Sequence, residues 1–143
     1  MLVIVSLTIA MSAPMFAATI DAGRARQAAQ FLAAQCRDAR ATAVARSASE
    51  ALVFDLSGTR WTFRRCSDGN GNGIRRAEIA RGVDHCGPAV ELSEQFGGVA
   101  ILVDGALPDP DGGIGSADPV RFGATNIASF SAAGTATAGT VYV

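Results

Sequence analysis

The first 47 residues carry two successive hydrophobic patterns. Residues 1–20 contain no charged side chain and are apolar on every side. From Asp21 to Ser47, apolar and small residues recur in steps of three and four, which places them on one face of a helix. We therefore expect one continuous helix that is apolar all round in its first part and amphipathic in its second, with residues 48–143 folded against the second part.

Residues 1–20 are long enough to cross a membrane. At about 1.5 Å per residue, this stretch would reach roughly 30 Å as a helix, which is the thickness of a bilayer's hydrocarbon layer. Pro14 is expected to kink or loosen the helix because proline lacks an N–H. The side chains expected to form this stem are Leu2, Val3, Ile4, Val5, Leu7, Ile9, Pro14 and Phe16.

Two other interpretations of residues 1–20 stay open. A secretory signal peptide would have a basic leader, an apolar core and a cleavage site with small residues. Small residues are present at 13–18, but no Lys or Arg precedes the apolar core. The third interpretation is a buried helix of a soluble protein. The length of the stretch and the missing basic leader favour a membrane stem.

The amphipathic part of the helix is expected to pack against a sheet. Because most residues of its apolar face are alanine, a sheet can approach the helix axis closely. The arginines at 26, 37 and 40 fall largely elsewhere, and we interpret them as a solvated surface, since aromatic partners for nucleic-acid stacking are scarce. The apolar face comprises Ala25, Ala28, Ala29, Leu32, Cys36, Ala39 and Ala43.

After Ser47 the pattern changes to alternation. Residues 50–56 and 60–65 are predicted to form a hairpin around a turn at 57–59, with Trp61 and Phe63 alternating with polar neighbours. Residues 67–79 are expected to be a turn rich in Gly and Asn, and residues 104–119 an irregular segment. Further short strands are expected at 89–92, 99–103, 120–122, 127–130 and 140–143. The fold class is therefore α+β, with a long N-terminal helix packed on an antiparallel sheet.

Charge is distributed unevenly along the chain. All twelve basic residues are arginine, and the formal net charge is −1. Residues 24–81 hold eleven Arg against five acids, whereas residues 82–143 hold one Arg against seven acids. Halves of opposite sign can attract each other within one subunit or between neighbouring subunits. The overall balance does not suggest a nucleic-acid binder.

The three cysteines have different surroundings. Cys66 and Cys86 flank the Gly/Asn-rich turn, as the cysteines of a loop-closing disulfide would, and such a bond requires an oxidising compartment. Cys36 lies on the apolar helix face and is interpreted as a small buried hydrophobe. A zinc site is not expected, because there is no CxxC pair and His85 is the only histidine.

The alternating Asp68, Asn70 and Asn72, followed by Gly73, resemble the opening of a calcium loop. The rest of the loop does not fit. Ile79 occupies the twelfth position, where a bidentate Glu is needed, and the ninth position is Arg76. We expect a plain turn without a tight calcium site, and neither a metal nor another cofactor elsewhere.

Catalysis is not expected. His85 and Cys86 are adjacent, so in extended backbone their side chains point apart. The sequence contains no GxSxG, P-loop or GxGxxG motif. We therefore expect no enzymatic activity and no small-molecule substrate.

Three stretches resemble type IV pilin-like proteins, and most closely the GspH/FimT family of minor pseudopilins and minor pilins. Residues 2–16 look like the stem that follows a prepilin cleavage site. Residues 25–46 are similar to the family's Ala/Arg-rich helix, through Arg37, Ala39, Arg40 and Ala43. Residues 127–143 resemble its closing strands, through Phe130, Gly134, Gly139, Val141 and Val143.

One departure concerns the start of the chain. The family begins with a short basic leader, a Gly cleavage site and a run that ends in Glu. Here Met1 stands where the residue after that Glu would be. The expectation is that the start codon was assigned too late; the alternative is that the processing signal has been lost.

The resemblance implies a non-enzymatic subunit of an envelope-spanning filament. Its stem would lie in the inner membrane and its head in the periplasm, and its partners would be the lipid bilayer, other pilins or pseudopilins, and the inner-membrane assembly platform. Minor members act near the filament tip and in initiating assembly. Some relatives use a basic C-terminal tail in DNA uptake, but this chain ends Thr140-Val141-Tyr142-Val143, so no nucleic-acid partner is expected. The alternative from the residues alone is a secreted β-rich binding domain with residues 1–20 removed.

Overall fold

The computed structural model describes the backbone of residues 2–103 and 118–143, and the side chains of residues 19–103 and 118–143. The chain begins with one helix, α1 (Leu2–Arg46), of 45 residues, which continues through Pro14 without a break. All eight side chains predicted to form the stem lie outside the described residues, as does most of the irregular segment expected at 104–119. Within the described part, no helix has the length and apolar character needed to span a bilayer.

The chain reverses direction immediately after α1. Ser47 adopts a left-handed backbone conformation with φ of 52°, and the Ala48 N–H donates to the Ala43 carbonyl at 3.2 Å. This arrangement ends the helix and satisfies one of its last carbonyl groups. Strand β1 (Glu50–Ser57) then begins and lies against the helix that precedes it.

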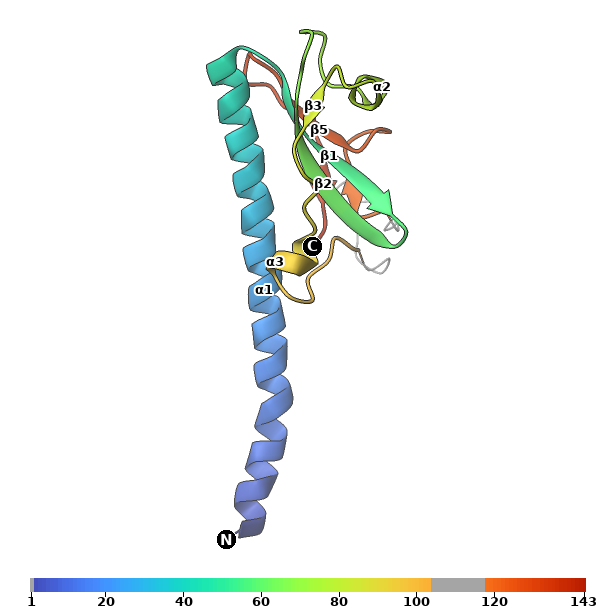
Figure 1. Ribbon diagram of the computed structural model, residues 1–143. Coiled ribbons are helices and arrows are strands. Elements are labelled where there is room, and N and C mark those ends of the chain that lie inside the picture. The colour runs from blue at the N-terminus through green and yellow to red at the C-terminus, as the bar shows by residue number, and fades with distance from the viewer. Residues whose placement is uncertain (1, 104–117) are drawn as a thin grey trace.

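The main sheet has the strand order β3-β2-β1-β5, and all its pairs are antiparallel. Its other strands are β2 (Arg60–Ser67), β3 (His85–Cys86) and β5 (Ile127–Phe130), while β4 (Val120–Arg121) and β6 (Thr140–Val141) form a separate pair. Figure 1 shows α1 running along one side of the sheet, with its N-terminal half extending away from the head. The predicted α+β class, with an N-terminal helix packed on an antiparallel sheet, is confirmed.

Strand β1 is buried on both faces. Leu52 and Phe54 face α1, whereas Ala51 and Val53 belong to a separate cluster, and all four are at most 1% exposed. We call the first cluster the helix-facing core. Its buried members are Ala28, Leu32, Ala39, Ala43, Leu52, Phe54, Phe63, Leu92, Val99, Ile101, Val120, Phe122, Ala128 and Phe130.

The second cluster, which we call the loop-facing core, is smaller. Its buried members are Ala51, Val53, Cys66, Ile74 and Ile127, with Ile79 and Cys86 partly buried against them. Ile74 precedes helix α2 (Arg76–Ala80), and Ile79 lies within it. This face is therefore covered by the Gly/Asn-rich loop and one short helix. The sequence predicted the loop but not the helix α2.

Two predicted strands are wrong. Of residues 89–92, only Val90 pairs, in an isolated bridge with Phe63, and helix α3 (Leu92–Gln95) follows at once. Residues 99–103 form no strand, although Val99 and Ile101 are buried in the helix-facing core. Short apolar runs of this kind are ambiguous, because burial in irregular backbone gives the same sequence pattern as a short strand.

Three side chains of the predicted helix face are less buried than expected. Ala29 is exposed although it was placed on the apolar helix face, and Ala25 and Cys36 are only half-buried. Phe31 lies against the core instead and contacts Phe63 and Phe96.

Candidate functional site

The predicted packing face of α1 lies against the head. Ala28, Ala39 and Ala43 are fully buried, and Leu32 is 7% exposed. The small side chains allow the helix backbone to lie close to the strands, so a larger residue at these positions would separate the two layers. This contact fixes the head on the C-terminal half of α1.

A charged network joins the helix to the sheet beside this contact. Arg65 on β2 donates to Glu50 at 3.0 Å and also contacts Asp38 on α1. Glu50 is only 3% exposed, and Arg46 on α1 also pairs with it at 3.8 Å, so this buried carboxylate has two cationic partners. Burial alone would lower the pKa of Arg65, but the hydrogen bonds to Glu50 and Asp38 outweigh burial and the pKa is raised.

The disulfide expected between Cys66 and Cys86 is present. The two residues lie directly opposite each other on β2 and β3. Cys66 is buried in the loop-facing core, so the bond closes the loop that covers this core. Cys36 is a free thiol, and burial raises its pKa. His85 is exposed and its neighbour Cys86 is in the disulfide, so the two do not form a nucleophile–base pair.

The loop between β2 and α2 is folded around the carboxylate of Asp68. Its Oδ1 accepts backbone N–H groups from Asn70 at 3.0 Å and Gly71 at 2.7 Å, and its Oδ2 accepts that of Gly73 at 2.6 Å. Burial by itself would raise the pKa of Asp68, but the hydrogen bonds from Asn70, Gly73 and Gly71 favour the charged form and the pKa is lowered.

Two further acids hold the loop from its other side. Asp84, which is 2% exposed, accepts the N–H groups of Gly69 at 3.2 Å and Arg75 at 3.0 Å. Glu78, which is 6% exposed, accepts the Asn72 side-chain amide at 2.9 Å through Oε1, while its Oε2 has no hydrogen-bond partner. Among the described residues, no group of three acidic, His or Cys side chains could hold a metal ion.

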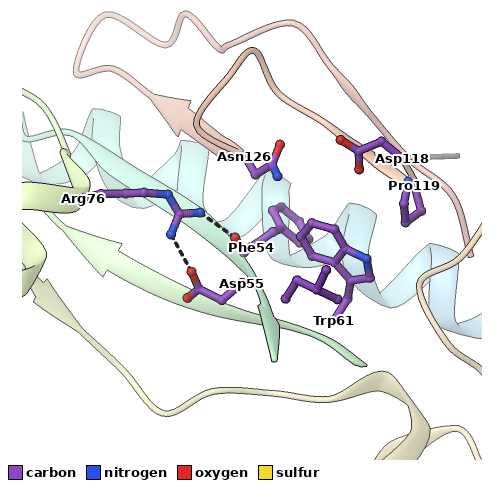
Figure 2. Close-up of a pocket in the computed structure, with 8 residues that line it drawn as sticks. Phe54, Asp55, Trp61, Arg76, Asp118, Pro119 and Asn126 are labelled. Carbon is purple, nitrogen blue, oxygen red and sulfur yellow. Dashed lines mark hydrogen bonds and ion pairs between the residues drawn. The ribbon is translucent and has the colours of Figure 1, made fainter. Parts of the chain in front are cut away.

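A cleft of about 700 Å³ opens at the far end of β1, where Leu56, Trp61 and Pro119 provide apolar walls. Figure 2 shows Arg76 reaching toward Asp55 and the Phe54 backbone on one side of this cleft, while Trp61 and Pro119 lie on the other. The cleft is open and combines apolar surface with groups that already have partners.

Arg76 is the most extensively bonded side chain of this cleft. Its guanidinium donates to the Phe54 carbonyl at 2.6 Å and the Thr125 carbonyl at 2.8 Å, and it pairs with Asp55. Asp55 also pairs with Arg64 at 2.9 Å. Arg76 therefore joins α2 to β1 and to the turn before β5, and it is a structural residue within the cleft.

Sequence reasoning did not identify Arg76, Glu78 and Asp84 as structural residues. Arg76 was considered only as a misfit in a calcium loop, and its partners lie more than twenty positions away. A signal for Asp84 was present, since an acid just before a cysteine that flanks a Gly/Asn-rich loop can accept the loop's N–H groups. No local pattern indicates that Glu78 is buried.

Comparison of the chain with models of protein families, with curated proteins and with solved structures finds no match.

Proposed function

We propose that this chain is a minor pilin-like subunit of the GspH/FimT type, which acts in filament assembly through contacts of its helix and its head. The observation that carries the proposal is the division of α1. Its C-terminal half is packed on the head through Ala28, Ala39 and Ala43, whereas Figure 1 shows its N-terminal half projecting beyond the head. A projecting helix of this length is suited to packing against the helices of other subunits.

The glycines of the closing motif support the resemblance physically. A Cβ at Gly139 would lie 2.2 Å from the Phe122 ring and 2.3 Å from the Arg121 carbonyl oxygen, so only glycine fits beside β4. Gly134 has φ of 78° and lies against Val44 on α1. The first of the two glycines therefore lies against α1, and the second lies against β4.

We further propose that residues 2–20 anchor the chain in the inner membrane, with the head in the periplasm. The absence of charge from residues 1–20 favours a lipid or helix-bundle environment for this stretch. The Cys66–Cys86 disulfide agrees with a head in an oxidising compartment. Alanine-rich and weakly polar helix faces can exchange lipid for neighbouring helices at low cost.

The test of the anchor compares two charge insertions in the full chain. Leu7→Arg places a cation within the uncharged stretch, whereas Ala22→Arg places the same cation just beyond it. The wild-type chain and Ala22→Arg are expected to resist extraction from membranes at alkaline pH, and Leu7→Arg is expected to be extracted. Equal extraction of the wild-type chain and Leu7→Arg would contradict the anchor.

The same material separates the proposal from the secreted-domain alternative. Retention of residues 2–20 in the mature protein supports a filament subunit, and a new N-terminus near residues 17–19 supports a secreted binding domain. For the filament itself, cysteine cross-linking between projecting helices is expected to capture other pilin-like chains. A purely monomeric product after cross-linking in the native membrane would overturn the proposal.

A further inference from the structure

The Gly/Asn-rich loop contains two Asn-Gly pairs, Asn70-Gly71 and Asn72-Gly73. In such a pair, the backbone nitrogen of the glycine can attack the side-chain carbonyl carbon of the asparagine. The small glycine does not obstruct this attack, and its backbone is the most flexible of any residue. All four residues lie among the described part of the chain, and both asparagines are exposed.

The two nitrogens that would attack are both bound by one carboxylate. The N–H of Gly71 donates to Asp68 Oδ1 at 2.7 Å, and the N–H of Gly73 donates to Asp68 Oδ2 at 2.6 Å. Both distances are short for N–H···O bonds, as is typical where the acceptor is charged. For either nitrogen to reach its asparagine, the hydrogen bond to Asp68 must first break.

We propose that this loop is a site of spontaneous deamidation. The Asp68 carboxylate suppresses the reaction by binding both attacking nitrogens. Asn70 is the first residue to react when these hydrogen bonds are lost. The proposal concerns the chemistry of the loop and does not depend on the proposed filament function.

The reaction balances without an external reagent other than water. The glycine nitrogen forms a bond to the asparagine Cγ, the bond from Cγ to Nδ2 breaks, and ammonia leaves with the proton lost by the glycine N–H. Water then opens the resulting five-membered imide at either carbonyl. The products are aspartate, or isoaspartate in which the main chain passes through the side-chain carbonyl.

Asp68 could instead act as a base that removes the glycine proton, but its chemistry disfavours that role. The hydrogen bonds of the loop lower the pKa of Asp68. A weaker base is a poorer acceptor for the proton of a backbone amide, which is far less acidic than a carboxylic acid. Binding of the nitrogens is therefore the dominant effect, and removing the carboxylate is expected to accelerate deamidation.

The two asparagines are held unequally. The Asn72 side-chain amide donates to buried Glu78 at 2.9 Å, which ties its leaving group to the body of the head. Within the described part of the chain, the amide nitrogen of Asn70 has no such anchor, and its Oδ1 accepts the Asn72 N–H at 3.2 Å. That hydrogen bond polarises the carbonyl that is attacked, so Asn70 is expected to react first.

The experiment follows deamidation by peptide mapping of the full chain with its disulfide intact, near neutral pH and at physiological temperature. Three samples are compared: the folded wild-type chain, the reduced and denatured wild-type chain, and folded Asp68→Ala. The denatured chain and Asp68→Ala are each expected to convert Asn70 at least about tenfold faster than the folded wild-type chain. Asparagine is not used at position 68, because it would precede Gly69 and create a third reactive pair.

Two further variants keep the test specific. Asp68→Ser keeps a short polar side chain but no carboxylate, and it replaces Asp68→Ala if the alanine variant does not fold. Asp84→Asn loosens the loop through Gly69 and Arg75 and leaves the two attacking nitrogens on Asp68, so it is expected to accelerate Asn70 much less. Circular dichroism and the retained disulfide establish that each variant is folded.

The outcomes separate clearly. Equal rates in folded wild type and in both Asp68 variants would overturn the proposal, and slower deamidation in those variants would show that Asp68 acts as the base. Equal acceleration by Asp84→Asn would show that general loosening, not the binding of the nitrogens, controls the reaction. Conversion of Asn72 ahead of Asn70 would refute the predicted order.

Discussion

The two faces of β1 are covered in different ways. The face that carries Leu52 and Phe54 is covered by α1, and its core is large, apolar and rich in aromatic rings. The face that carries Ala51 and Val53 is covered by a loop and the five-residue α2, with few apolar side chains. A long regular element can fix its position by packing alone, whereas a short irregular one buries too little apolar surface to do so.

The loop-facing core is held by other interactions. The Cys66–Cys86 disulfide, the Arg76 contacts and the carboxylates of Asp68 and Asp84 all lie on or around it. Covalent and polar contacts here replace the apolar area that the loop cannot supply. The two faces of β1 are therefore expected to respond differently to mutation.

The largest expected effect is on the helix-facing core. Phe54 is 1% exposed and stacks on Phe122 with ring centroids 5.6 Å apart. Phe54→Ala is expected to lower the free energy of unfolding by about 4 kcal/mol, against about 2 kcal/mol for Val53→Ala on the opposite face. Urea unfolding of both variants measures the difference. A larger loss in Val53→Ala would reverse the ranking of the two cores.

Removal of the disulfide tests the loop-facing core. The double variant Cys66→Ser/Cys86→Ser is expected to lower the free energy of unfolding by about 3 kcal/mol. The bond closes a loop of 20 residues, and without it the unfolded chain has more conformational entropy. Cys36→Ser, which breaks no disulfide, is the control and is expected to lose less. The experiment is thermal unfolding with and without reductant, in which Cys36→Ser should respond to reductant like the wild-type chain.

The close approach of α1 to the sheet can be tested by adding volume. Ala39 is fully buried, so Ala39→Leu is expected to cost about 2 kcal/mol by forcing the helix away from β1. Ala41→Leu adds the same side chain to an exposed position of the same helix, where about zero change is expected. Similar losses in the two variants would show that the added volume is not what matters.

The smallest expected effect depends on pH. Because the pKa of Asp68 is lowered below its ordinary value of 3.8, the charged carboxylate stabilises the folded chain above that value. This stabilisation is lost as the pH falls through the lowered pKa. The difference in unfolding free energy between wild type and Asp68→Ser is therefore expected to be constant near neutrality and to shrink in acid. A difference that grows on acidification would have the wrong sign.

Much of the fold could be predicted because its signals are local. The steps of three and four in residues 21–47 predicted the helix that ends at Arg46, and the alternation around Trp61 and Phe63 predicted the hairpin. In contrast, the strand expected at 89–92 rested on three apolar residues, and the one at 99–103 on five. Runs of that length do not distinguish a strand from irregular buried backbone.

The parts that sequence reasoning missed depend on distant partners. Residues 76–80 are too few to show helical periodicity, and α2 is held by Arg76 through groups on β1 and before β5. The burial of β1 on both faces likewise follows from how the loop folds back over Val53. The Asn-Gly pairs were visible in the sequence, but the common carboxylate that binds them was not.

The length of α1 has a mechanical consequence. At about 1.5 Å per residue its 45 residues extend roughly 68 Å, and the head packs against only the C-terminal half. A pull on the N-terminus along the helix axis would load Ala28, Ala39 and Ala43 together, in shear, against the head. Under a sideways push on the same end, the helix would act as a lever arm, and the torque would be greatest near Ala28. An axial pull is therefore resisted by several contacts at once, and a transverse push by fewer.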